Sequence, residues 1–369
     1  MELKDIIIKR IKQEGPISFH DFMEMALYYP GIGYYTSPSE KFGTNGDFLT
    51  SCTISAAFGT MVAKQLEEIW NILGTETFTI AEFGAGNGSL CNDVLSYFKQ
   101  DKNKFDNIHY CIIEKSSALR DKGKSLVAGN VSWYKSILEL GELDGCIISN
   151  ELLDNFAIHQ VEMQNELMEI YVDYQNNSFT EVLKPASSQL KNYLQQLNIN
   201  LPKGYRTEIN LEAKEWLHDI SQTLRKGYII TMDYGFQSEA LYANHKSNGT
   251  LLCYYKHSIN DNVYENIGRQ DITSHVNFTA LQNSGKQMGL EDCGFTNQAN
   301  FLLALGFKDF FRKMPEPGTN IMQAALEEAR VTRTLLLDLG LKIKVLIQKK
   351  GVKEKNLTGL KHQEEITFV

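Results

Sequence analysis

The sequence predicts an α/β fold with a doubly wound, mostly parallel sheet, a helical N-terminal segment and an inserted region. Two observations predict the sheet. Nearly continuous apolar runs alternate with helical stretches between residues 78 and 150, and a glycine-rich turn, "GAGNG", directly follows the first run. Strands that are apolar along their whole length are typical of parallel sheets covered by helices on both faces. The alternation stops after Asn150, which indicates an insertion.

The N-terminal segment, residues 1–74, is expected to be helical and to pack on the core. The second of its helices begins with Ser18 as the N-cap and Asp21 three positions later, a pattern close to a capping box. Helices are predicted over residues 6–11, 18–29 and 54–73.

The core is expected to comprise residues 75–156, 206–239 and 341–350. Helices are predicted up to residue 98 after the first strand and over residues 115–128 after the second. Strands are predicted over residues 78–83, 108–114, 131–134, 144–150, 227–236 and 342–349.

The remaining segments, residues 157–205 and 240–340, are expected to form an inserted region that lines a substrate cleft. The first segment contains hairpin strands over residues 157–184. The second is the least regular part of the chain. Helices are predicted over residues 187–198, 212–224 and 320–339 and near residues 280–288.

Composition and charge disfavour several classes of function. The net charge of -8 argues against a general nucleic-acid binder. No apolar stretch approaches about 18 residues, and charged residues interrupt the N-terminus, so neither a membrane span nor a secretory signal is expected. The six cysteines are scattered without a CxxC pair, which favours free thiols in a reducing cytoplasm over disulfides or a metal site. We therefore expect a cytoplasmic protein without a bound metal.

The turn after the first strand contains Gly84, Gly86 and Gly88, preceded by Glu82, and is a candidate ligand site. Between a strand and a helix, such a turn presents backbone N–H groups and the positive end of the helix to a ligand. The dinucleotide pattern G-x-G-x-x-G fails because Ser89 stands at its last position. The pattern present, E-x-G-x-G-x-G, is similar to the first motif of S-adenosylmethionine-dependent methyltransferases. The simpler alternative is a tight turn that holds no ligand.

A second carboxylate favours a ligand that carries a ribose. Glu114 ends the second strand, about 30 residues after the first glycine, where an acidic side chain can accept hydrogen bonds from ribose hydroxyls. The alternative is an acidic residue that merely neighbours a helix N-cap. In combination with the glycine turn, the position of Glu114 favours ribose binding.

Further stretches resemble the MidA-type methyltransferases. They are "GPIS", "YYPGIGYY", "GDFLTS", "SNELLDNF", "MDYGF", "GTLLCYYKHSINDN" and "DITSHVNFTAL", in order along nearly the whole chain. That family includes the mitochondrial assembly factor that methylates an arginine of the quinone-proximal subunit of respiratory complex I. The resemblance implies a Rossmann-like methyltransferase sheet and S-adenosyl-L-methionine as the cofactor. Ala85, Asn87 and "TSCTIS" depart from the usual family pattern, but they remove no carboxylate and no glycine.

Candidate catalytic residues follow the fourth strand, because ligands of open α/β sheets bind at the carboxyl ends of the strands. Asn150 ends that strand, Glu151 follows, and Asp154 stands one turn further on. Methyl transfer needs an aligned acceptor, and a carboxylate can hold a guanidinium by two hydrogen bonds. Glu151 is predicted in that role, with Asp154 as a second clamp. The alternative is that Glu151 starts a helix and Asp154 lies on its solvated face.

Two other carboxylates lie near the predicted site. Asp47, in the loop "GTNGDFLTS", is expected to fold over the cofactor near its amino group, with an ordinary turn as the alternative. Asp233, in "MDYGF", ends another strand and is predicted in the acceptor pocket. The complete cofactor-binding prediction is Asp47, Glu82, Gly84, Ala85, Gly86, Gly88, Glu114 and Asn150.

The glycine turn, the carboxylates and the family resemblance together predict an S-adenosylmethionine-dependent protein methyltransferase, and the resemblance implies that it acts on an arginine of a respiratory complex I subunit. The expected partner is a protein substrate, with no nucleic acid. Two alternatives remain open. One is a non-catalytic assembly chaperone that keeps the cofactor fold. The other is a small-molecule O-methyltransferase, which would need a catalytic base and a closed apolar pocket.

Overall fold

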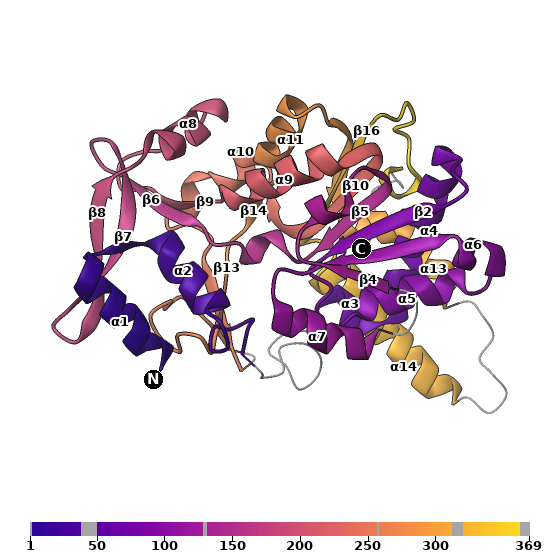
Figure 1. The fold of residues 1–369 in the computed structure, drawn as a ribbon, viewed down its shortest axis with the longest axis horizontal. Coiled ribbons are helices and arrows are strands. Elements are labelled where there is room, and N and C mark those ends of the chain that lie inside the picture. Colours follow the sequence, from indigo (N-terminus) through magenta and orange to yellow (C-terminus); the bar gives the residue numbers. More distant parts are fainter. Residues whose placement is uncertain (1, 38–49, 128–130, 257, 312–319, 362–369) are drawn as a thin grey trace. The chain divides into compact units, whose positions relative to one another are not determined.

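The computed structural model describes residues 2–37, 50–127, 131–256, 258–311 and 320–361 (Figure 1). The chain divides into two compact units. The first unit comprises Met1–Phe48, Leu153–Leu217 and Gly235–Ser284, and the second comprises Leu49–Leu152, His218–Tyr234 and Gly285–Val369. The three-part domain division drawn from the sequence stays a prediction.

The second unit contains a sheet with the strand order β15-β16-β10-β5-β2-β3-β4. Five neighbouring strands, from β4 to β10, run parallel, while β16 is antiparallel to both β10 and β15. This arrangement confirms the predicted doubly wound, mostly parallel sheet. The strands are β2 (Phe78–Phe83), β3 (Ile108–Ile113), β4 (Val131–Tyr134), β5 (Leu143–Asn150), β10 (Leu224–Phe236), β15 (Glu291–Asn297) and β16 (Ile343–Lys350).

The strand order reverses at β2. The chain moves outward from β2 through β3 to β4, then returns to place β5 on the other side of β2 and continues outward to β10. At such a reversal, the connections after the two neighbouring strands leave in opposite directions, so a crevice opens at their carboxyl ends. The ends of β2 and β5 therefore define the expected ligand position in this unit.

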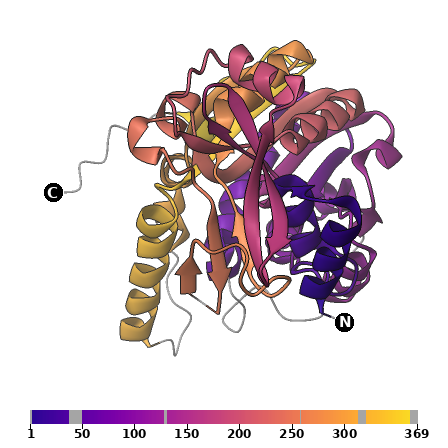
Figure 2. The ribbon, with the colours of Figure 1, turned by 90° about the vertical axis from the view of Figure 1, so that its left-hand side faces the viewer.

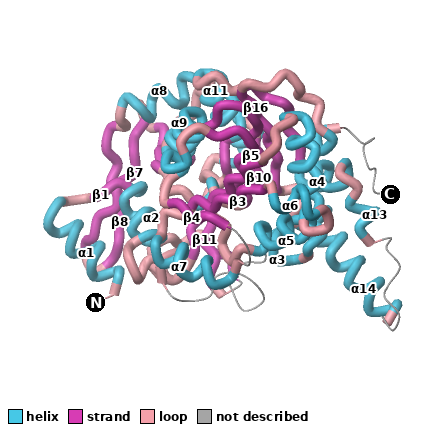
Figure 3. Tube along the Cα trace, turned by 45° about the vertical axis from the view of Figure 1, so that its right-hand side comes forward, coloured by secondary structure: helices cyan, strands magenta, loops and turns pink. Residues whose placement is uncertain are grey.

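One apolar core joins this sheet to its helices. Side chains of α4, α5 and α12 form a single cluster with apolar residues of β2, β3, β5, β10 and β16. Figure 3 shows α4 and α5 alongside the strands. The helices are α3 (Ser51–Ile54), α4 (Ala56–Leu73), α5 (Ser89–Phe98), α6 (Lys102–Asp106), α7 (Ser117–Leu126), α12 (Gln298–Ala304), α13 (Phe307–Phe310) and α14 (Ile321–Thr332).

Helix α14 extends from its unit (gold in Figure 2). Its Ile321, Met322 and Leu326 side chains are 75%, 69% and 64% exposed. The sequence predicts one helix over residues 320–339. Instead, α14 continues as a π-helical segment, η4 (Arg333–Asp338), after which the Leu339 N–H donates to the Thr334 carbonyl at 3.0 Å. In the described parts of the chain, no helix is both long and apolar enough to cross a bilayer.

The first unit contains an antiparallel sheet with the order β1-β7-β6-β9, with β8 paired to β7, and a second sheet with the order β12-β11-β13. Its helix α1 is longer than predicted because Leu3, Ile7 and Ile11 are all buried on one face. The elements are α1 (Leu3–Glu14), β1 (Ile17–Ser18), α2 (Phe19–Tyr28), β6 (His159–Met163), β7 (Leu167–Gln175), β8 (Ser178–Pro185), α8 (Ser188–Gln196), β9 (Arg206–Ile209), α9 (Glu212–Thr223, which continues into the second unit), α10 (Ser238–Leu241), β11 (Leu252–Tyr255), β12 (Ser258–Asn260), β13 (Asp271–Thr273), β14 (Val276–Asn277) and α11 (Phe278–Gln287, which also crosses the boundary).

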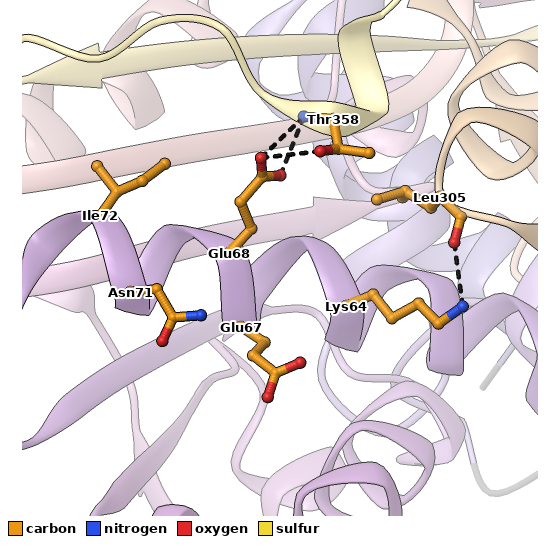
Figure 4. A pocket seen from close by; sticks show the side chains of 7 residues that line it. All are labelled: Lys64, Glu67, Glu68, Asn71, Ile72, Leu305 and Thr358. Atoms are coloured by element: carbon orange, nitrogen blue, oxygen red, sulfur yellow. Dashed lines mark hydrogen bonds between the residues drawn. The ribbon is translucent and has the colours of Figure 1, made fainter.

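A surface cavity of about 460 Å³ lies along α4 in the second unit (Figure 4). There the Glu68 carboxylate accepts hydrogen bonds from the Thr358 N–H at 3.0 Å and from the Thr358 hydroxyl at 2.9 Å. Lys64 donates to the Leu305 carbonyl at 3.1 Å. The two hydrogen bonds of Glu68 therefore hold the turn η5 (Thr358–Leu360) against α4 beside the cavity. It is lined by Lys64, Glu67, Glu68, Asn71, Ile72, Leu305 and Thr358, none of which belongs to the predicted site.

We expect Glu68→Ala to weaken the attachment of η5 to α4. The substitution leaves the Thr358 N–H without its acceptor, which costs about 1–3 kcal/mol of the free energy of unfolding. Asn71→Ala, in the same cavity, should stay within about 0.5 kcal/mol of the wild type. Chemical denaturation of the full chain measures both values. Equal stability of the two variants would contradict the fastening role of Glu68.

Candidate functional site

The glycine turn between β2 and α5 requires glycine for its backbone. Gly84, Gly86 and Gly88 have φ angles of +62°, +55° and +77°, in the left-handed region that L side chains rarely adopt. A Cβ atom on Gly84 would also meet the Leu152 side chain at 2.8 Å. Gly88 is the N-cap of α5, so the turn brings the positive end of that helix to the carboxyl end of β2. The turn therefore needs glycine at these three alternate positions. It also contains Ala85.

Glu82 lies inside β2 and is almost fully buried, with 4% of its surface exposed. The Tyr110 hydroxyl donates a hydrogen bond of 2.7 Å to its Oε2 atom. Burial raises the pKa of Glu82 to about 7, although this hydrogen bond acts in the opposite direction. The predicted role of Glu82 in cofactor binding stays a prediction, and its contacts also serve the packing of β2 against β3.

Glu114 follows β3 and is held by its own turn. Its Oε1 accepts the Ser116 N–H at 2.8 Å, and its backbone N–H donates to the Tyr134 carbonyl at 2.9 Å. Arg120 donates to the Glu114 carbonyl at 2.6 Å. Burial raises the pKa of the Glu114 carboxyl. β3 pairs directly with β2, so Glu114 stands one strand away from the glycine turn.

Glu151 has an unusual backbone at the end of β5. Its φ angle is +49°, which costs a residue with a side chain roughly 1–2 kcal/mol. Its N–H donates to the Met232 carbonyl at 2.9 Å. Its Oε1 accepts the Ser51 N–H at 3.0 Å and the Asn150 amide at 3.2 Å. These bonds hold the carboxylate in one place, and burial raises its pKa to about 7.

Asp233 is fully buried in β10, next to the same loop. Its Oδ2 accepts the Leu152 N–H at 3.0 Å, and its Oδ1 accepts the Tyr234 N–H at 2.8 Å. Both carboxylate oxygens therefore bond the backbone, and one of these bonds fixes the residue after Glu151. The predicted role of Asp233 in the acceptor pocket stays a prediction. Its hydrogen bonds support the loop after β5.

Two predicted residues are not among the site residues of the second unit that the structure describes. Asp154 belongs to the first unit, where it is 6% exposed and its carbonyl accepts the Ser274 N–H at 2.9 Å. Asp47 lies outside the described residues. The second unit by itself brings together the glycine turn, Glu114, Asn150, Glu151 and Asp233.

Three neighbours of the site were not singled out from the sequence. Ser51 bonds Glu151, Tyr110 bonds Glu82, and the Cys52 thiol accepts a hydrogen bond from Asn150 at 3.5 Å. Ser51 closes the "GDFLTS" stretch, whose resemblance to the family was the one available signal. Within the described ranges, no three His, Cys, Asp or Glu side chains are arranged to hold a metal ion.

The residues at the ends of β2, β3 and β5 fit an adenosine-containing ligand with a charged amino acid group. The glycine turn offers backbone N–H groups, and Glu114 offers an acceptor for ribose hydroxyls. The Ser149 hydroxyl and the side-chain Oδ1 atom of Asn150 are buried without a hydrogen-bond partner in the described part of the chain. Buried polar atoms of this kind are usually bonded, so this pair at the strand end suits a polar ligand.

Comparison with known families decides the class of ligand. The sequence profile of a family of S-adenosyl-L-methionine-dependent methyltransferases matches residues 61–296. The chain belongs to this family. The match extends from α4 to β15 and includes the glycine turn, Glu114, Glu151 and Asp233.

Curated relatives of this methyltransferase include mitochondrial proteins of animals. The relative from Caenorhabditis elegans, named protein arginine methyltransferase NDUFAF7 homolog, is 26% identical over 93% of this chain and 85% of its own length. The protein arginine methyltransferase NDUFAF7 of Homo sapiens is 24% identical over 81% of this chain and 72% of its own length. These similarities confirm the predicted resemblance to MidA-type enzymes.

A crystal structure of a methyltransferase-like protein from Burkholderia thailandensis resembles this methyltransferase over nearly its whole length. The TM-score is 0.87 at 28% identity, with 97% of this chain and 94% of the other covered, and that protein is bound to S-adenosyl-homocysteine. A native crystal structure from the same organism gives a TM-score of 0.85 at 27% identity, with the same coverage. The cofactor of this methyltransferase is S-adenosyl-L-methionine, as predicted.

The buried Glu82 should make stability depend on pH. A carboxyl whose pKa rises from 4.5 to about 7 on folding stabilises the fold below pH 4.5, and this contribution is lost as the pH rises through 7. The loss amounts to about 3 kcal/mol at 1.36 kcal/mol per pKa unit. We expect Glu82→Gln, which still accepts the Tyr110 hydroxyl, to remove this part of the dependence. Denaturant titrations from pH 4 to 8 measure it.

The exposed Glu76, which precedes β2, provides the control for this experiment. Glu76→Gln removes a carboxylate that is not buried, so its stability should follow the wild-type curve. A Glu82→Gln variant with the wild-type pH dependence would show that Glu82 is not the group responsible.

Glu114→Ala should weaken cofactor binding. Hydrogen bonds to a charged group contribute about 1.5–3 kcal/mol, and about 1.4 kcal/mol corresponds to one decade in affinity. We expect the Kd for S-adenosyl-homocysteine to rise at least about tenfold in calorimetry, while the exposed Asp121→Ala on α7 binds like the wild type. Unchanged affinity would show that the Glu114 carboxylate holds the turn at Ser116 and does not bind the cofactor.

Proposed function

We propose that this methyltransferase transfers a methyl group to a guanidinium nitrogen of an arginine in a protein, and that this protein is a subunit of respiratory complex I. The names of the Caenorhabditis elegans and human relatives support arginine in a protein as the acceptor. The resemblance to the MidA-type family supports complex I as the destination of the substrate.

The single observation that carries the proposal is the placement of Glu151. A residue with a side chain persists at a φ of +49° only when its surroundings impose that conformation, and such residues cluster at functional sites. Here the Met232 carbonyl holds the Glu151 backbone, while the Ser51 N–H holds its carboxylate. This places a fixed carboxylate at the end of β5, adjacent to the strand that carries the glycine turn.

A carboxylate at this position suits an arginine acceptor. The cofactor supplies an electrophilic methyl group on a positively charged sulfur. Glu151 can accept two parallel N–H bonds from a guanidinium, which orients one nitrogen for in-line attack. Transfer would break the sulfur–methyl bond, leave a neutral thioether and make the acceptor nitrogen release a proton, which an adjacent carboxylate with a pKa of about 7 could receive. The ionised form of Glu151 predominates above pH 7, so transfer should increase as the pH rises through 7.

The decisive experiment compares host cells with and without this protein by mass spectrometry of the whole proteome. We expect a methylarginine on a complex I subunit that is lost on deletion and restored by the wild-type chain. Glu151→Gln should not restore it, because methyl transfer should fall by on the order of 10²-fold or more when one positioned catalytic group is removed. The same variant should bind S-adenosyl-homocysteine like the wild type in calorimetry.

Other outcomes separate the alternatives. Glu151→Gln with the wild-type rate would remove Glu151 from the mechanism and make Asp233 the next candidate. A methylated small molecule in place of a protein would identify an O-methyltransferase. No cofactor-dependent methylation of any molecule would identify an assembly chaperone that keeps the cofactor fold.

A further inference from the structure

Two backbone N–H groups fasten the loop after β5 to β10. The Glu151 N–H donates to the Met232 carbonyl at 2.9 Å, and the Leu152 N–H donates to the Asp233 carboxylate at 3.0 Å. Between these bonds, Glu151 keeps a φ of +49°, a conformation that its side chain disfavours. The loop is therefore held from the side of β10, and its position determines where the Glu151 carboxylate lies.

The side chain of Leu152 reaches to the other side of β5, where the glycine turn lies. Its Cδ1 atom is 2.8 Å, and its Cγ atom 4.0 Å, from the position that a Cβ atom on Gly84 would take. In the sheet, β5 stands between β10 and β2. Leu152 therefore connects the strand that fastens the loop with the strand that carries the turn, and glycine at position 84 leaves room for this contact.

The glycine turn loses motion when a ligand binds to it. Gly84, Gly86 and Gly88 leave its backbone more conformational freedom than residues with side chains would. A ligand that bonds the N–H groups of the turn removes part of this freedom. A side chain that packs on the turn then meets a more rigid surface, so part of the ordering reaches that side chain and the backbone that carries it.

We infer that Leu152 couples the cofactor site to the Glu151 carboxylate, because its contact with Gly84 lets a bound cofactor steady the loop after β5. Leu152 is a positioning residue, since it acts through Glu151. The catalytic meaning of the coupling rests on the proposed function, in which Glu151 holds the acceptor arginine. Coupling between two sites is reciprocal, so the acceptor should bind best when the methyl donor is already in place.

Hydrogen exchange of the full chain, followed by mass spectrometry, tests the coupling without any methyl transfer. The N–H groups of Glu151 and Leu152 exchange when their bonds to β10 open. We expect S-adenosyl-homocysteine to slow exchange of the peptide that contains them at least about fivefold in the wild type, and less than about twofold in Leu152→Ala. Calorimetry verifies that each variant is saturated with the ligand.

Two controls separate the coupling from general stabilisation by the ligand. Leu152→Met keeps a long apolar side chain against Gly84 and should keep the slowing. The Thr358 N–H, which bonds Glu68 on α4 in the same unit, should respond equally to the ligand in all three chains. Leu152 is half-buried, and the main apolar core, as far as the structure describes it, does not include it, so the shortened variant should fold.

A double-mutant cycle gives a second measurement that needs no ligand. In Gly84→Ala the new Cβ atom competes with Leu152 Cδ1 for space, and the backbone keeps the strain of a φ of +62°. Leu152→Ala removes the first effect but not the second. Gly84→Ala should therefore lower the denaturation midpoint less in the Leu152→Ala background than in the wild type. Additive effects would show that the two residues are not in contact and would overturn the inference.

The exchange measurement and methyl transfer decide different claims. Equal slowing in the wild type and in Leu152→Ala, or no slowing in the wild type, would overturn the inference. Methylarginine formation decides the proposed function separately. A wild-type chain whose loop is protected through Leu152, but which methylates no arginine, would support the coupling and overturn the proposed function.

Discussion

The reversal of strand order at β2 is the constraint on which the rest of the second unit depends. Because β3 and β5 pair with opposite sides of β2, the loops after β2 and β5 diverge, and a ligand can reach the backbone of both. The glycine turn provides the close approach on one side. On the other side, Asp233 and Met232 of β10 fasten the loop after β5, which brings the Glu151 carboxylate into a fixed position.

Much of this arrangement follows from local signals in the sequence. The apolar runs of β2, β3, β5, β10 and β16 are long and bounded by turn residues, so their periodicity and their composition both predict strands. The alternate spacing of the glycines predicts the turn after β2. In contrast, β15 has the sequence "EDCGFTN", with a bulge near Gly294, and its Glu, Asp, Gly and Asn residues are of types that are depleted in strands. Only its pairing with β16 makes it a strand, and that pairing is set by tertiary structure.

The chemistry of the site was accessible from sequence only in part. Glu151 could be chosen because it directly follows a strand of a parallel sheet, but neither its left-handed backbone nor its bond to Ser51 has a signature in one sequence. Gln298, whose side chain accepts the Ser51 hydroxyl, stands almost 150 residues further along the chain than Glu151 and lies in a segment without clear periodicity. Asp154 shows that nearness in the sequence can also mislead, because it stands only three positions after Glu151 but belongs to the other compact unit.

The backbone of Glu151 also has a consequence for how this protein can change through evolution. Glycine would adopt a φ of +49° without strain, and asparagine would adopt it more easily than glutamate. Substitutions to either residue are therefore a route by which the chain could gain stability and lose its carboxylate in one step. If selection acted on folding alone, position 151 would drift toward these residues. Retention of an acidic side chain there in a set of related chains would record selection for chemistry against the preference of the backbone.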